Sequence, residues 1–248
     1  MKKILLILSL ILTFLGVYAK ENSNVTLYVN GELVGYNRFG SIEEKDSPAI
    51  LKDGKTYIEL KTLLRRMPYL KYEKEKLSYK ESEYQKIESI EIKGKKYLPI
   101  RKLADTFGIK INWDAKTKTA MLGQYLNSSL ELLKSSGEKI NFEKIKASFI
   151  LPKDFKDNVE IKEIKDAVEF KDKKNLKAGG RLFTISWNKG PISSMVPGVI
   201  LDYKDGKFLE AYFSSDVQVD TSKKELEESY VKLRKMSFDV LQTYEEIK

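Results

Sequence analysis

The sequence predicts an α+β protein, in which a duplicated unit of β-hairpins and short helices precedes an antiparallel sheet packed by a long C-terminal helix. Three observations favour this fold class. The segments GKTYIELKTLL (54–64) and GKKYLPIRKLA (94–104) repeat one pattern, 40 residues apart. Asn-Gly and Asp-Gly pairs separate short runs of alternating apolar residues, which is typical of β-hairpins. Near the C-terminus, apolar residues recur at steps of three and four, which is helical spacing.

The first 19 residues have the pattern of a secretory signal peptide. Lys2 and Lys3 precede a nearly unbroken apolar run from Ile4 to Leu15, and residues 17–19 offer a small-residue cleavage pattern. A retained membrane anchor is the alternative, although a spanning helix needs roughly 20 apolar residues and this run is shorter. We therefore expect cleavage after Ala19 and a secreted or envelope protein with no transmembrane segment in the mature chain.

The composition restricts the chemistry of the chain, because its 248 residues include no His and no Cys. Catalysis by Ser-His-Asp or Cys-His groups lacks its side chains, and so do the usual zinc, copper and haem sites. No glycine-rich phosphate loop and no GxSxG motif occurs. We therefore predict no catalytic residue, no metal site and no cofactor. A carboxylate pair that hydrolyses a glycan, a Ser-Lys dyad and a calcium loop are the alternatives that this composition leaves.

The formal net charge is +9, from 45 Lys and Arg against 36 Asp and Glu, and the excess lies mostly in residues 20–127. A basic exported module could attract teichoic acid, phospholipid head groups or other polyanions. A well-solvated Lys-rich surface is the plainer interpretation. We expect no nucleic-acid partner, because the chain is predicted to be exported and shows no interleaving of Arg with aromatic residues. The absence of Cys in an exported chain of this size fits a bacterial envelope.

The predicted elements of the first unit follow one another closely. Residues 25–34 predict a hairpin that turns on Asn30–Gly31. Each repeated segment then predicts a hairpin, a short helix and a second hairpin. The first helix spans Leu60–Met67 and is stopped by Pro68, and the second continues to Phe107 and is capped by Gly108. The two copies should share one core, with Tyr57, Tyr97, Ile100, Leu103, Phe107 and Trp113 as members. Sugar stacking is the alternative for the aromatic residues.

The stretch KYLPIRKLADTFGIKINWDAKTKTAML (96–122) resembles the copper amine oxidase N-terminal-like domain, also called the stalk domain. The resemblance covers residues 25–123 and is weaker in the first copy, where Glu59 stands at the family's Pro and Pro68 at its Leu-Gly end. It implies an extracellular structural or ligand-holding module without copper ligands or oxidase chemistry. We accordingly place a stalk-like domain at residues 20–124.

A connector is predicted at residues 125–137, and an α+β domain with a long helix at residues 138–248. Strand-like stretches and a hairpin on Asp205–Gly206 precede a capping box, Ser222 to Glu225, and a helix of about six turns. This half loosely resembles an uncharacterised α+β domain of exported proteins from low-GC bacteria, most recognisably at residues 216–218 (Asp-Val-Gln). The alternative to a functional site in that region is a structural role, in which Asp220 or Thr221 near the start of the helix interacts favourably with the helix dipole.

One loop, SWNKGPISSMVPG (186–198), is a candidate for interaction with a partner. Its candidate contact residues are Trp187, Asn188, Pro191, Met195 and Pro197. Two Pro lower the cost of ordering such a loop, and Trp with Met suits an adaptable contact surface. A packed loop that covers the end of the sheet is the alternative.

The function that these observations predict is non-catalytic binding or scaffolding at the cell envelope, with a wall polymer or another envelope protein as ligand. A carboxylate-dependent glycan hydrolase is the rival. An inhibitor or accessory partner of an exported enzyme is the third possibility, with the 186–198 loop as its inserted element.

Overall fold

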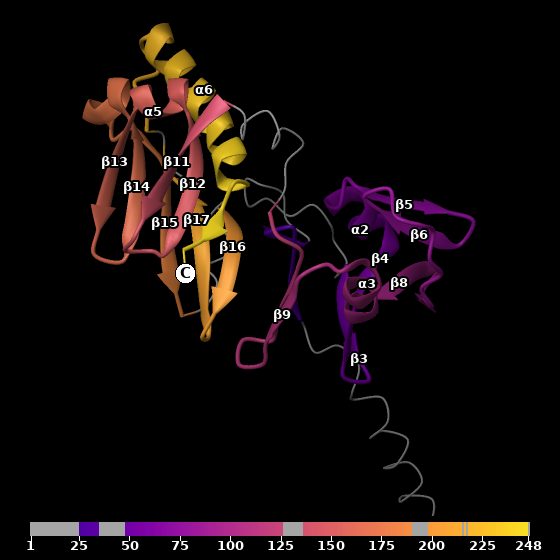
Figure 1. Ribbon diagram of the computed structural model, residues 1–248. Coiled ribbons are helices and arrows are strands. Elements are labelled where there is room, and N and C mark those ends of the chain that lie inside the picture. The colour runs from indigo at the N-terminus through magenta and orange to yellow at the C-terminus, as the bar shows by residue number, and fades with distance from the viewer. Residues whose placement is uncertain are drawn as a thin grey trace, which may run out of the picture.

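The computed structural model describes residues 25–34, 48–125, 136–189, 198–214, 216 and 218–247. The predicted signal peptide, most of the predicted connector and the loop residues Pro191, Met195 and Pro197 lie outside this part of the chain. Figure 1 shows two units side by side, an N-terminal unit up to residue 125 and a C-terminal unit from residue 136. Both contain strands and helices, and their sheets are mainly antiparallel, so the mixed α+β class is confirmed.

The N-terminal unit opens with a hairpin of β1 (Thr26–Val29) and β2 (Glu32–Leu33). Two stretches with the same order of elements follow. The first contains β3 (Ala49–Lys52), β4 (Lys55–Glu59), α2 (Leu60–Arg66), β5 (Leu70–Glu73) and β6 (Lys76–Tyr79). The second contains β7 (Ile90–Ile92), β8 (Lys95–Pro99), α3 (Ile100–Phe107), β9 (Ile111–Asp114) and β10 (Thr119–Leu122).

Two four-stranded sheets hold this unit together. In the sheet β3-β4-β8-β7, the central strands place Tyr57 opposite Pro99 and Tyr97 opposite Glu59, so both repeated tyrosines lie in one sheet. In the sheet β2-β1-β10-β9, β1 pairs in parallel with β10. That pairing brings the first strand of the unit beside its last.

The predicted turn residues of the first hairpin and the predicted cap of the second helix are confirmed. Asn30 and Gly31 have φ angles of 50° and 76°, the left-handed pair that a tight hairpin turn needs. Gly108 has φ 63° and ψ 31°, and its backbone N–H donates to the carbonyl of Ala104. The chain can therefore leave α3 and enter β9 after a single left-handed residue.

The core of the N-terminal unit contains only part of the predicted set. Tyr97, Ile100 and Leu103 are buried, whereas Tyr57 and Phe107 are half-buried. The prediction for Trp113 is wrong, because this side chain is 37% exposed. Trp113 belongs to the edge strand β9.

The C-terminal unit begins with two hairpins separated by a short helix. These elements are β11 (Gly137–Phe142), β12 (Ala147–Pro152), α5 (Lys153–Asn158), β13 (Val159–Ile164) and β14 (Ala167–Asp172). The remaining elements are the 3₁₀ turn η1 (Lys173–Ala178), β15 (Arg181–Asn188), β16 (Gly198–Lys204), β17 (Lys207–Phe213), α6 (Lys224–Leu241) and β18 (Glu245–Glu246).

A five-stranded sheet, β13-β14-β15-β17-β16, and a three-stranded sheet, β11-β12-β18, enclose one apolar core with α6. Phenylalanines fill its centre, where the rings of Phe170 and Phe183 stack with centroids 4.3 Å apart. Helix α6 contributes Leu233, Val240 and Leu241 to this core. The helix therefore lies against the sheets as the sequence predicts, and Figure 1 shows it running along one side of the unit.

The predicted capping box at the start of α6 is wrong. The helix begins at Lys224, and its N-cap residue Lys223 makes no side-chain capping hydrogen bond. The hydroxyl and the backbone N–H of Ser222 both donate to Oδ1 of Asp220, so this hydroxyl is engaged before the helix begins. The helix has 18 residues, about five turns rather than six.

The two units meet along β16. The backbone N–H of Ile200 donates to the carbonyl of Gly31 at 2.8 Å. Around this bond, a small apolar cluster joins Tyr28 and Met121 of the N-terminal unit to Ile200 and Phe208 of the C-terminal unit. An ion pair between Lys110 and Asp202 also crosses the boundary.

Candidate binding groove

A groove of about 1040 Å³ opens in the N-terminal unit. Its walls come from the β3–β4 hairpin, residues 86–90, the first turns of α3 and the edge strand β9. These segments are far apart in the sequence and meet because β4 pairs with β8 while β9 belongs to the second sheet. The groove is therefore a product of the way the two sheets are joined by α3.

Two aromatic side chains line the groove, Trp113 from β9 and Tyr57 from β4. Trp113 shares a face of its sheet with Ile111, which packs against the core. Its cross-strand neighbour is Ala120, whose methyl group is too small to cover the indole ring. The ring is consequently held at the groove with part of its surface exposed to solvent.

Basic side chains surround these rings. Lys55 begins β4, and Arg101 and Lys102 lie in the first turn of α3, all three being exposed. In the part of the chain that the structure describes, none of the three makes an ion pair or a side-chain hydrogen bond. A ligand that carries negative charge would therefore meet cations that form no ion pair with the described carboxylates.

Other lysines nearby are already committed to protein partners. Lys96 donates to Glu75 at 2.6 Å and to the hydroxyl of Tyr72 at 3.1 Å. The hydrogen bond from Lys96 lowers the pKa of the Glu75 carboxyl, and the bond to Glu75 raises the pKa of the Lys96 amine. Lys95 pairs with Glu59 at 3.7 Å. Lys95 and Lys96, which both belong to β8, are therefore held by carboxylates of the protein.

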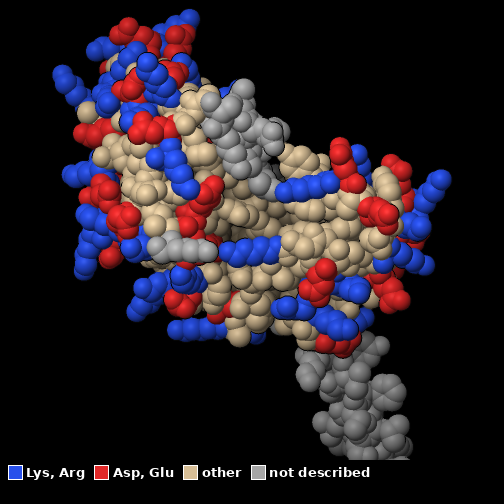
Figure 2. All heavy atoms as spheres, in the orientation of Figure 1, with Lys and Arg blue, Asp and Glu red and all other residues tan. Residues whose placement is uncertain are grey.

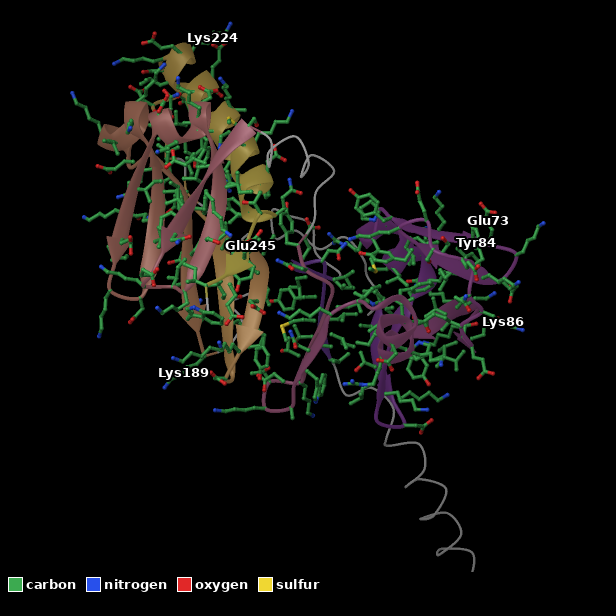
Figure 3. The ribbon with its side chains drawn as sticks, in the orientation of Figure 1. Glu73, Tyr84, Lys86, Lys189, Lys224 and Glu245 are labelled. Carbon is green, nitrogen blue, oxygen red and sulfur yellow. The ribbon has the colours of Figure 1, made fainter. Side chains whose placement is uncertain are left out.

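The groove is also lined by two carboxylates, Glu88 and Asp105, and by a fourth cation, Lys86, so four cations line it with two acids. Figure 3 labels Lys86 at the outer side of the N-terminal unit, below Tyr84 and Glu73. On the face that Figure 2 shows, acidic and basic side chains are interspersed. The side chains that line the groove therefore carry a small excess of positive charge.

Two residues of the predicted interaction loop, Trp187 and Asn188, belong to β15 of the other unit. Trp187 packs against the core of the C-terminal unit, and its indole N–H donates to the carbonyl of Ile145 at 2.8 Å. The side-chain amide of Asn188 donates to Glu210 at 3.1 Å. Both residues are anchored at the end of β15.

Within the described ranges, no group of three or more acidic side chains is placed to hold a metal ion. No helix in those ranges is both long and apolar enough to cross a membrane. No protein-family model, curated protein or solved structure matches the chain.

The sequence contained one signal for this site. Arg101 and Lys102 stand in the first turn of a helix, where the helix dipole favours acidic residues instead. A residue type that disfavours the local helix is expected at functional positions more often than elsewhere. The sequence offered Trp113 and Tyr57 only as core residues, with sugar stacking as the alternative, because their meeting in one groove depends on the order of the strands.

Proposed function

We propose that the chain is an exported, non-catalytic binding or scaffolding protein of the bacterial cell envelope, and that the groove holds its ligand. The ligand is an anionic wall polymer or an acidic segment of another envelope protein. The observation that carries the proposal is a partly exposed Trp113 beside three cations, Lys55, Arg101 and Lys102, that lack ion-pair partners within the described residues.

The two kinds of side chain supply different parts of the binding free energy. Covering the exposed part of an indole ring removes apolar surface from water and allows stacking against a planar or apolar ligand group. The unpaired cations attract an anion without first breaking an internal ion pair. Together they favour ligands that carry both negative charge and apolar or ring-shaped surface.

We also propose that the two stretches of the N-terminal unit are diverged copies of one unit, and that residues 20–124 form a stalk-like domain. The shared eleven-residue pattern and the shared order of hairpin, helix and hairpin support this proposal. In such an arrangement, each copy supplies two strands to the sheet β3-β4-β8-β7 and neither copy alone encloses the groove.

The fluorescence of Trp113 provides the first test. The chain has two Trp, so the substitution Trp187→Phe leaves Trp113 as the sole indole reporter. A glycerol-phosphate polymer and poly-glutamate are titrated into this variant at low and high salt. We expect a saturable change with at least one of them, weakened by salt because exposed charges are screened.

The double substitution Arg101→Ala, Lys102→Ala should weaken this binding about tenfold, as expected for two charge-assisted contacts. Lys207→Ala removes an exposed cation at the start of β17, in the other unit, and serves as the control. Equal affinities for the double variant and the control, or no fluorescence response to either polymer, would contradict the proposal.

A carboxylate-dependent glycan hydrolase is the second candidate, because Glu88 and Asp105 line the same groove. Such an enzyme requires two carboxyl groups on opposite sides of a glycosidic bond. Incubation of the chain with wall glycan, followed by measurement of new reducing ends, separates the two functions. Release of reducing ends that is lost in Glu88→Gln or Asp105→Asn would establish the hydrolase and refute the non-catalytic proposal.

A further inference from the structure

Strand β9 lies at the edge of its sheet, with β10 as its partner among the described residues. An edge strand presents backbone N–H and C=O groups on its free side, and proteins usually protect such an edge with bulges, prolines or covering segments. The free side of β9 instead borders the groove, because Ile111, Asn112 and Trp113 all line it.

The hydrogen bonds around β10 determine which backbone groups of β9 are free. The N–H of Gly123 donates to the carbonyl of Lys110, and the N–H of Asn30 donates to the carbonyl of Leu122. The backbone of Leu122 therefore faces β1, and the opposed pair Ile111–Leu122 exchanges no hydrogen bonds. Two residues further on, the pair Trp113–Ala120 is of the same kind.

The backbone N–H and C=O groups of Ile111 and Trp113 consequently point away from β10. In the residues that the structure describes, these four groups have no hydrogen-bond partner. They are spaced two residues apart, which is the spacing that a neighbouring strand uses. The side chain of Trp113 lies beside them, and Arg101 and Lys102 line the same groove.

We propose that the groove binds an extended, acidic peptide segment of a partner protein, which adds to the sheet as a strand beside β9. This inference rests on the proposed function and names its ligand class. A peptide supplies alternating N–H and C=O groups that match those of Ile111 and Trp113, whereas a glycan or a polyol phosphate has no such series. Carboxylates of the peptide meet Lys55, Arg101 and Lys102, and its apolar side chains meet Trp113 and Tyr57.

The backbone contribution is tested with short fluorescent peptides that alternate Glu with Val or Tyr. In an extended peptide, the N–H groups of odd residues point to one side and those of even residues to the other. Two N-methylated versions, one at odd and one at even positions, keep every side chain and remove one set of donors. We expect one version to bind about tenfold more weakly and the other to bind nearly as the parent does. Equal affinities for the two versions, or no binding of any peptide, would overturn the inference.

A matched pair of substitutions tests the same contact from the side of the protein. Trp113→Pro and Trp113→Val both remove the indole ring, but only Pro removes the backbone N–H. Because that N–H points away from β10, Pro costs the sheet no ladder hydrogen bond and both variants should fold. We expect the peptide to bind the Pro variant at least about threefold more weakly than the Val variant. Equal binding of two folded variants would exclude strand addition at this residue.

The outcomes separate this inference from the proposed function. A response of Trp113 to the glycerol-phosphate polymer without any response to the peptides leaves the groove as a binding site and refutes strand addition. If the fluorescence of Trp113 responds neither to the polymer nor to the peptides, the proposed function is refuted as well. Peptide binding that distinguishes the two N-methylated versions supports both.

Discussion

Leu103 and Trp113 lie in the same unit but differ in what their side chains do. Leu103 is fully buried in the core, whereas Trp113 keeps more than a third of its surface exposed at the groove. We predict that Leu103→Ala lowers the free energy of unfolding by about 2–5 kcal/mol, the usual cost of a cavity in a packed core. Trp113→Ala should lower it by no more than about 1 kcal/mol.

Denaturant unfolding measures both changes, and a ligand titration completes the comparison. A large loss of stability in Trp113→Ala would mean that the indole ring belongs to the core and is not available to a ligand in the groove. Trp113→Ala with near-normal stability and weakened ligand binding would assign the ring to recognition.

At single residues, the sequence predicted burial well where the spacing of apolar residues matches the helix. Ile100 and Leu103 share the inward face of α3, so the spacing that predicts the helix also predicts their burial. Trp113 follows the same alternation as Ile111, yet nothing large lies opposite it on β10. Periodicity gives the face on which a residue lies, and only the tertiary arrangement decides whether that face is covered.

Among the elements, the hairpins were the most predictable, because their turns require specific residues. Asp53 and Asp205 both adopt positive φ before a glycine, as the Asp-Gly signal predicts. The parallel pairing of β1 with β10 had no comparable local signal, since a period of two does not name a partner strand. The capping box failed for a similar reason, because Asp220 competes for the hydroxyl of Ser222.

The attachment of α6 to the small sheet depends on the hydroxyl of Thr243. This buried oxygen accepts from the backbone N–H of Ile150 at 2.8 Å and donates to the carbonyl of Val240 at 2.6 Å. Thr243→Val preserves the shape of the side chain but leaves the N–H of Ile150 without its partner. We predict a loss of about 1–3 kcal/mol in the free energy of unfolding.

Thr243→Ser is the matched control, since it retains the hydroxyl and loses one methyl group. It should cost about 1 kcal/mol or less. Chemical denaturation of both variants measures the difference. If Ser destabilises the chain as much as Val does, the methyl group rather than the hydrogen bonds holds the end of α6 on β12.

At the scale of the whole molecule, the contact between units was not predictable from the sequence. Gly31 and Ile200 belong to different units that are far apart in the sequence, and no local pattern pairs them. Polar contacts surround the apolar cluster. The carboxylate of Asp202 forms an ion pair with Lys110 and accepts a hydrogen bond from the hydroxyl of Tyr244. Burial raises the pKa of the Tyr244 hydroxyl, and the hydrogen bond to Asp202 raises it further. The boundary thus combines apolar packing, a backbone hydrogen bond and an ion pair.

Gly31 shows how closely the units approach. A methyl group on its Cα would lie 2.4 Å from the backbone carbonyl oxygen of Ile200, and its φ of 76° also disfavours any side chain. Gly54 occupies an equivalent turn with φ 71°, but nothing lies within 4 Å of its virtual Cβ. Gly54→Ala should therefore cost only the backbone strain, about 1–2 kcal/mol. Gly31→Ala should cost roughly 1–3 kcal/mol more, because a rigid backbone atom of the other unit must move.

The two Trp residues allow the units to be followed separately, because Trp113 reports on the N-terminal unit and Trp187 on the C-terminal unit. In the single-Trp backgrounds Trp187→Phe and Trp113→Phe, coincident unfolding transitions mean that the units unfold together. We predict coincidence for the parent chain and for Gly54→Ala, and separation of the two transitions for Gly31→Ala.

Loosening this boundary should also weaken ligand binding. Strand β9 borders the groove, and Lys110, next to β9, pairs with Asp202 of the other unit. Coincident transitions in Gly31→Ala with unchanged binding would show that the N-terminal unit holds its groove without support from the C-terminal unit.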